Sequence, residues 1–353
     1  MKMLSLAVLA LGALALPGSG NALSVSVIFD PSRTMDLNWS EHVQAGLSLS
    51  LRGQDDIQVL DAVAYSGSQP LATVVADTGA DVVITNVAEA GGALNGTDDG
   101  PLLINLSPDL NGSCDKRTVH LAGDVALGRL AALYMNSLNA QRTFAFVKQG
   151  EEGKQNLDDF QRAYTGGLGG AAFATPNQDD FNNEIAILRV TKADGAYFDL
   201  EGEALYGYLN AYAEGVIADD LKAVTTSEID YDRLSNTTRS ALSSVTLLSA
   251  WNPDTVDATK FKTAFNAWIG EDPSFAGLMG FEAGNLLVKA MKGTRETLFD
   301  NVVALSWQSP RGPVSFDAHG YAIVPVGAYG FTETALSLKG RISVAANHSC
   351  TPS

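Results

Sequence analysis

Two successive runs of alternating strand-like and helix-like segments constrain this chain of 353 residues more than any other feature. In the first run, Val43, Leu47 and Leu51 recur at helical spacing after an apolar segment, which predicts an amphipathic helix after a strand. The strands predicted in this run are 24–29, 57–63, 82–85 and 101–106. Apolar segments that alternate with helices are typical of a buried parallel sheet with helices on its faces.

The pattern starts again at Arg142, and this restart predicts a second lobe. The strands predicted here are 143–147, 171–174, 195–198, 223–227 and 245–250. The chain is also longer than one hydrophobic core usually supports. A glycine-rich segment at 167–172 loosely imitates a dinucleotide-binding loop, but it precedes a strand instead of following one, so we predict no nucleotide site there. We therefore expect an α/β protein with two lobes, each a parallel sheet flanked by helices.

Residues 272–325 predict a helix, a second helix and a hairpin. Asp272 has the form of an N-cap and Pro273 that of a first helical residue, and apolar residues then recur at helical spacing. Gly280 and Gly284 lie four residues apart, which predicts a smooth stripe that a neighbouring backbone can approach closely. The hairpin strands are predicted at 312–316 and 321–324.

The composition argues against nucleic acid as a partner. The formal net charge is −17, and the sequence has no cluster of Lys and Arg that could neutralise phosphates. The sequence lacks the motifs of nucleophile-elbow hydrolases, P-loop proteins and zinc proteases, and its four histidines are scattered. We therefore expect no catalytic residue, no metal and no cofactor, and we do not expect an enzyme.

Residues 1–22 have the form of a cleaved signal peptide, because Lys2 precedes an apolar stretch and small residues lie before the expected cleavage site. We therefore expect export to the periplasm and a mature chain that begins near Leu23. The two cysteines are Cys114 and Cys350, so an exported chain can form one disulfide between them. Two separate thiols are the alternative.

The order of elements in residues 272–325 resembles the closing segment of the type I periplasmic solute-binding proteins, in particular the leucine/isoleucine/valine-binding branch that serves ABC importers. The pattern along nearly the whole mature chain is similar to that branch. The resemblance implies two Rossmann-like lobes joined by a three-strand hinge, which the chain crosses near Ala140, Ala250 and His319. Lobe 1 would then hold residues 23–140 and 251–319, and lobe 2 residues 141–250 and 320–353.

In parallel α/β sheets, ligands bind beyond the carboxyl ends of the strands, so the loops after the predicted strands hold the candidate binding residues. In the first lobe these are Arg33, Asn86, Ser107 and Asp109. In the second lobe they are Asp199, Glu201 and Glu228, whose carboxylates suit a ligand ammonium group. Each of these carboxylates has the alternative of lying in solvent. Arg33 is suited to a ligand carboxylate, and its alternative is a pair with Asp36.

The resemblance adds Trp39, which lies just before the first helix, where amino-acid-binding relatives present an aromatic wall to the ligand. Its alternative is to cover the surface of the first lobe. Ser107 falls where those relatives hold the ligand carboxylate through hydroxyl and N–H groups. Asp109 departs from their hydroxyl-rich run, and its charge would repel a carboxylate, which implies a changed pocket.

Together these features imply an exported solute-binding protein. It would capture a small polar metabolite, such as an amino acid, an amide or a related carboxylate, between its lobes by hinge closure and present it to an ABC permease. We expect a monomer. A ligand sensor of the same fold and an exported α/β hydrolase are the alternatives. A nucleophile within hydrogen-bond reach of a histidine in the cleft would favour the hydrolase.

Overall fold

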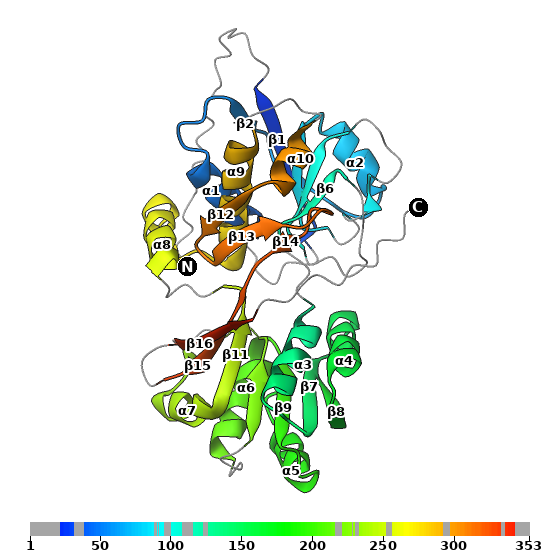
Figure 1. Ribbon diagram of the computed structural model, residues 1–353, viewed down its shortest axis with the longest axis vertical. Coiled ribbons are helices and arrows are strands. Elements are labelled where there is room, and N and C mark those ends of the chain that lie inside the picture. The colour runs from blue at the N-terminus through cyan, green and yellow to red at the C-terminus, as the bar shows by residue number, and fades with distance from the viewer. Residues whose placement is uncertain are drawn as a thin grey trace, which may run out of the picture.

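The computed structural model describes residues 22–31, 39–87, 90, 92–94, 100–107, 116–122, 126–215, 221–227, 229, 233–251, 256–291, 297–332 and 336–342. Figure 1 shows these residues arranged as two lobes, one above the other, with a few chain segments passing between them. Each lobe has its own sheet, its own helices and its own hydrophobic core. The predicted two-lobed α/β architecture is confirmed.

Lobe 1 is built on a parallel sheet in the order β2-β1-β4-β5-β6, with β3 also paired to β1. Its strands are β1 (Leu23–Phe29), β2 (Ile57–Val59), β3 (Val63–Ala64), β4 (Val82–Thr85), β5 (Leu102–Asn105) and β6 (Thr118–His120). Its helices are α1 (Trp39–Ser50), α2 (Leu71–Asp77), α8 (Val256–Ile269), α9 (Phe275–Ala290) and α10 (Leu298–Val303). A small antiparallel sheet packs against the same core and consists of β12 (Ser306–Ser309), β13 (Gly312–Phe316) and β14 (Ala322–Ile323).

Lobe 2 is built on a sheet in the order β16-β15-β11-β10-β9-β7-β8, in which the five strands from β11 to β8 are parallel. Its strands are β7 (Arg142–Lys148), β8 (Gly167–Ala174), β9 (Gly195–Asp199), β10 (Lys222–Thr225), β11 (Val245–Ser249), β15 (Val326–Phe331) and β16 (Leu336–Ile342). Its helices are α3 (Leu127–Ser137), α4 (Glu151–Ala163), α5 (Asn182–Val190), α6 (Gly202–Glu214) and α7 (Asn236–Ala241), with a 3-10 turn at Leu242–Ser244. Helices α3 and α4 pack on one face and α5 and α6 on the other, so both faces are buried.

The places where the chain passes between the lobes follow from the core that each flanking residue joins. Leu121 belongs to the core of lobe 1, whereas Leu130 of α3 belongs to a core of lobe 2. Val324 lies in the core of lobe 1 and Val326 in that of lobe 2. The first crossing therefore precedes α3, and the third falls at Pro325.

Two of these positions differ from the expected crossings near Ala140 and His319. Helix α3 joins lobe 2 because its apolar face packs beside α4 on the second sheet. Residues 320–324 stay with lobe 1 because β14 pairs with β13. The second crossing lies between Leu248, in the core of lobe 2, and Trp251, which packs against the core of lobe 1.

Helices α1 and α9 approach closely along a stripe of glycines. A Cβ atom at Gly280 would overlap the carbonyl of Val43, and one at Gly284 would overlap the side chain of Ser50. From the other side, a Cβ at Gly46 would overlap the carbonyl of Gly277. The predicted smooth stripe on α9 is therefore confirmed, and it lets two backbones pack without intervening side chains.

The predicted start of α9 was wrong by two residues. Ser274 is the N-cap, and its Oγ accepts a hydrogen bond from Gly277 N at 3.4 Å. The carboxylate of Asp272 is engaged elsewhere, because it pairs with Lys262 Nζ at 2.8 Å and accepts from Asn266 at 3.2 Å. These contacts hold the pKa of Asp272 below its ordinary value, with the hydrogen bond from Lys262 as the largest cause.

Two predicted strands also had the wrong extent. The strand expected at 57–63 is split into β2 and β3, which pair with successive parts of β1. The strand expected at 171–174 begins at Gly167, because the glycine-rich segment pairs with β7, with one shift of register after Leu168. That segment is therefore part of an edge strand and not a loop.

Candidate functional site

The carboxyl ends of the parallel strands in each lobe point toward the other lobe. Strand β6 ends at His120, just before the chain leaves lobe 1, and β11 ends at Ser249, just before the chain returns to it. Because the strands of each sheet are parallel, their neighbours end on the same side (Figure 1). We name these two sides the facing edges, and ligands of parallel α/β sheets bind at such edges.

Asp199 lies at the centre of the facing edge of lobe 2, as the last residue of β9. It is 4% exposed, and its Oδ2 accepts a hydrogen bond from Asn156 Nδ2 of α4 at 2.7 Å. Its Oδ1 lies 3.4 Å from Thr226 Oγ1, which follows β10 and also lies 3.4 Å from the hydroxyl of Tyr197. Burial raises the pKa of Asp199 above its ordinary value, although Lys148 and Asn156 oppose the shift. Through these contacts, the buried carboxylate of Asp199 fixes the positions of Asn156 and Thr226.

Lys148 lies at the facing edge of lobe 2 and pairs with two carboxylates there. It is the last residue of β7, and its Nζ lies 2.7 Å from Glu152 Oε1 and 3.3 Å from Glu201 Oε2. Burial lowers the pKa of Lys148, but the charges of Asp199, Glu152 and Glu201 outweigh it, so the net pKa lies above the ordinary value. The predicted residues Asp199 and Glu201 thus belong to one charge network around Lys148.

Asn86 braces two loops at the facing edge of lobe 1. It follows β4 and is 6% exposed, and its Oδ1 accepts a hydrogen bond from the backbone N–H of Asp30 at 2.8 Å. Asp30 follows β1, so this bond joins the ends of adjacent strands. The buried amide of Asn86 is therefore used to shape the edge.

Ser107 is half-buried after β5, and its backbone N–H donates to Asn105 Oδ1 at 2.9 Å. Asn105 in turn lies 3.3 Å from the ring of His120. Trp39 is the first residue of α1 and packs, half-buried, against the core of lobe 1. The role of Trp39 as a wall for the ligand stays a prediction.

Several predicted residues lie outside the described part of the chain. They are Arg33 with its alternative partner Asp36, Asp109, Glu228, the two cysteines Cys114 and Cys350, and residues 1–21 of the signal peptide. Their roles stay predictions.

The sequence did not single out Lys148, Asn156 or Thr226. Lys148 directly follows the apolar segment 143–147, so the rule that selected the other strand ends would have found it. Asn156 comes from the interior of α4, and only tertiary packing brings it to Asp199.

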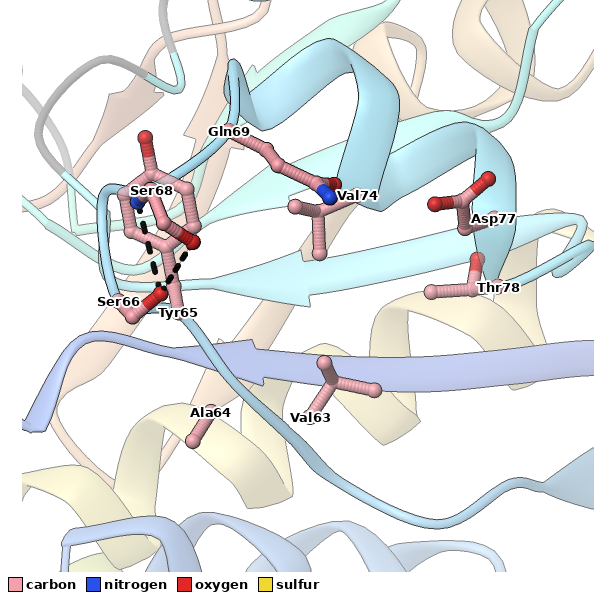
Figure 2. A pocket seen from close by; sticks show the side chains of 9 residues that line it. All are labelled: Val63, Ala64, Tyr65, Ser66, Ser68, Gln69, Val74, Asp77 and Thr78. Atoms are coloured by element: carbon pink, nitrogen blue, oxygen red, sulfur yellow. Dashed lines mark hydrogen bonds between the residues drawn. The ribbon is translucent and has the colours of Figure 1, made fainter.

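A separate hollow of about 320 Å³ lies in lobe 1, between β3 and α2 (Figure 2). Tyr65, Gln69, Asp77 and Thr78 contribute to its polar wall. The hydroxyls of Ser66 and Ser68, also in the wall, lie 2.8 Å apart and bond to each other. None of the predicted binding residues that the structure describes lines this hollow.

A serine and a histidine meet where α1 and α9 begin. His42 Nδ1 lies 2.7 Å from Ser274 Oγ, and His42 Nε2 lies 3.3 Å from Glu271 Oε2. His42 is buried, whereas Glu271 is exposed. The same Ser274 hydroxyl is the N-cap of α9.

Within the described ranges, no three His, Cys, Asp or Glu side chains come together in a way that could hold a metal ion. The helices of the same ranges include none that is both long and apolar enough to cross a bilayer.

The fold and the facing edges define a two-lobed α/β protein with a parallel sheet in each lobe. A profile of the periplasmic binding protein family matches residues 51–330, so the chain belongs to that family. A comparison with curated protein sequences gave no match.

Solved structures share the fold over nearly the whole chain. One is a solute-binding protein of an ABC transporter from R. palustris in complex with benzoate, with 19% identity and a TM-score of 0.68 over 93% of this chain and 98% of that one. A branched-chain amino acid ABC transporter periplasmic ligand-binding protein from Burkholderia xenovorans has 13% identity and a TM-score of 0.73, over 91% and 95% of the two chains. LivJ from Streptococcus pneumoniae, in complex with isoleucine, has 16% identity and a TM-score of 0.65, over 92% and 99%.

Proposed function

We propose that this chain is an exported, monomeric solute-binding protein of an ABC importer. It captures a small polar metabolite, which is an amino acid, an amide or a related carboxylate, between the facing edges and presents it to a membrane permease. Closure of the lobes follows from a ligand that binds the closed form more tightly than the open one, so no covalent chemistry is required.

The observation that carries this proposal is the polar lining of the facing edge of lobe 2. Thr226, Glu201 and Lys148 are half-buried there; Thr226 bonds to the buried Asp199, and Lys148 and Glu201 pair with each other. A hydroxyl, a carboxylate and an ammonium at one edge suit a ligand that carries both donors and acceptors. The proposal also draws on two of the structural relatives, which are in complex with benzoate and with isoleucine.

Thermal unfolding of residues 23–353 against a panel of compounds tests the proposal. The panel holds L-isoleucine, L-glutamine, benzoate, acetamide and putrescine. A compound at a hundred times its dissociation constant adds about 2.7 kcal/mol to the free energy of unfolding, which raises the midpoint by a few degrees. We expect a selective shift and recovery of that compound unchanged. If no compound shifts the midpoint, and extraction of the purified protein yields no bound metabolite, the proposal is wrong.

One contact favours the hydrolase alternative, because His42, Ser274 and Glu271 are arranged as a base, a hydroxyl and a carboxylate. The capping bond from Gly277 N to Ser274 Oγ opposes it, since that bond gives the hydroxyl a structural role. Hydrolysis of p-nitrophenyl acetate by the wild type and by Ser274→Ala separates the two readings. We expect equal background rates, and a rate that Ser274→Ala abolishes would favour the hydrolase.

A further inference from the structure

A buried ion pair in lobe 1 joins α9 to the turn between β12 and β13. The side chains of Glu282 and Arg311 are fully buried. Arg311 Nε donates to Glu282 Oε1 at 2.9 Å, and Arg311 Nη2 lies within ion-pair distance of Glu282 Oε2, at 2.7 Å. The hydroxyl of Ser309 donates to the same Oε1. A charge-assisted hydrogen bond together with this ion pair fixes the direction of the guanidinium as well as its position.

The same guanidinium also contacts the start of the first hinge segment, by which we mean the chain that passes from β6 in lobe 1 to α3 in lobe 2. Arg311 Nη2 donates to the backbone carbonyl of Leu121 at 2.8 Å. Leu121 comes directly after β6, and the chain leaves lobe 1 before α3 begins. The ion pair thus connects the segment that leads to lobe 2 with the interior of α9.

The third hinge segment leaves lobe 1 from the same base. The backbone N–H of His120 donates to Gly320 O at 2.9 Å, and the rings of His120 and Tyr321 stack at a centroid distance of 4.0 Å. The chain then runs through β14 to Pro325, where it passes to lobe 2. Figure 1 shows β6 and β14 close together above the segment that descends to lobe 2. The first and third hinge segments therefore leave lobe 1 from neighbouring positions.

Stability alone does not account for an ion pair at this position. Two apolar side chains of similar volume often stabilise an interior as well as a buried ion pair does. An apolar pair could not donate to the carbonyl of Leu121, so direction is the contribution that only the charged pair makes.

We propose that Arg311, held by Glu282, is a positioning residue for lobe closure. It fixes the exit angle of the first hinge segment beside the third and thereby limits the range of lobe orientations in the free protein. This inference rests on the proposed function, because a fixed hinge root matters only where the lobes move. Glu282 orients the guanidinium, and the backbone carbonyl of Leu121 accepts a hydrogen bond from it.

The test measures the distance between the lobes in the ligand-free protein by electron spin resonance. Spin labels are attached through unnatural amino acids at Asp77 of α2 and Asn183 of α5, two exposed positions on different lobes. The variants are E282L/R311M, which replaces both charges together, and R311K, which keeps the charge but has one nitrogen in place of the fork. The matched control is L286A, which weakens the same core from the next turn of α9 and leaves both charged side chains in place.

We expect a broader or shifted distance distribution in E282L/R311M and in R311K, and the wild-type distribution in L286A. If E282L/R311M does not fold, R311K alone decides. Wild-type distributions in the charge variants that fold would overturn the inference, and so would equal broadening in L286A, because general weakening of lobe 1 would then be the cause. No ligand is added in this experiment. Failure of the compound panel would therefore contradict the proposed function, and the distance distributions could still be interpreted.

Discussion

Asn156 Nδ2 donates a hydrogen bond of 2.7 Å to Asp199 Oδ2, and this bond joins α4 to the end of β9 at the facing edge of lobe 2. Both side chains are buried. A buried carboxylate is stable only with such partners, because burial removes its hydration. The bond therefore determines how the facing edge is shaped and how Asp199 titrates.

Asn156→Leu removes the donor and leaves the carboxylate of Asp199 buried without it. We expect the free energy of unfolding to fall by roughly 2 to 3 kcal/mol, the usual loss for a hydrogen bond to a charged group. Urea unfolding at neutral pH measures it. The control is Gln155→Ala, which removes a half-buried bond to Asp159 on the same helix. The account fails here if both variants lose the same small amount.

Asp199→Asn should change how stability depends on pH. Burial raises the pKa of Asp199 in the folded state above its ordinary value of 3.8, so the folded protein holds this proton more tightly than the unfolded chain. The free energy of unfolding contributed by Asp199 therefore falls as the pH rises from about 3.8 through the raised pKa. Asp199→Asn lacks this contribution.

Urea unfolding of the wild type and of Asp199→Asn between about pH 4 and pH 7 measures the difference. We expect the wild type to lose stability relative to the variant as the pH rises, until Asp199 is fully ionised. A difference that is constant over the whole range would mean that the pKa of Asp199 is not raised.

Lys148→Met should raise the pKa of Asp199 further, because the positive charge of Lys148 favours the ionised carboxylate. Carbon-13 NMR titration of the Asp199 carboxyl carbon measures the change. Lys154→Met, at an exposed position of α4, is the matched control. Equal shifts in the two variants would show that the effect is one of net charge and not of position.

Gly280→Ala should destabilise lobe 1, because a Cβ at this position overlaps the carbonyl of Val43 on α1. Overpacking of this kind typically costs about 1 to 3 kcal/mol, and here the backbones themselves must separate. Thermal unfolding compares it with Gly340→Ala, where a Cβ meets no atom within 4 Å. Equal midpoints for the two variants would show that the α1–α9 contact is looser than the structure indicates.

The two-lobed fold was predictable because most strands are apolar runs long enough to stand out against helical periodicity. Strand β4 reads Val-Val-Ile-Thr and is buried along its whole length. In contrast, β6 reads Thr-Val-His and has no such run, and it forms because it pairs with β5. Strand β16 is largely exposed at the sheet edge and carries no burial pattern to detect.

The lobe boundaries were less predictable for a physical reason. The sequence of an apolar helix face such as that of α3 is compatible with packing on either sheet. Tertiary packing against α4 determines that α3 belongs to lobe 2. The same reason explains why the sequence pointed to some residues at the facing edge and not to others. Asp199 ends a recognisable strand and Glu201 follows it, whereas Asn156 reaches Asp199 from helix α4. The sequence pattern predicts where strands end, but it does not predict which side chains contact the residues at those ends.

Ligand-dependent closure is the central claim, and small-angle X-ray scattering measures it most directly. The radius of gyration of residues 23–353 is compared without ligand and with the panel compound that gives the largest thermal shift. We predict a smaller radius in the presence of that compound, because the facing edges come together over it. A compound that raises the unfolding midpoint and leaves the radius of gyration unchanged would contradict the account.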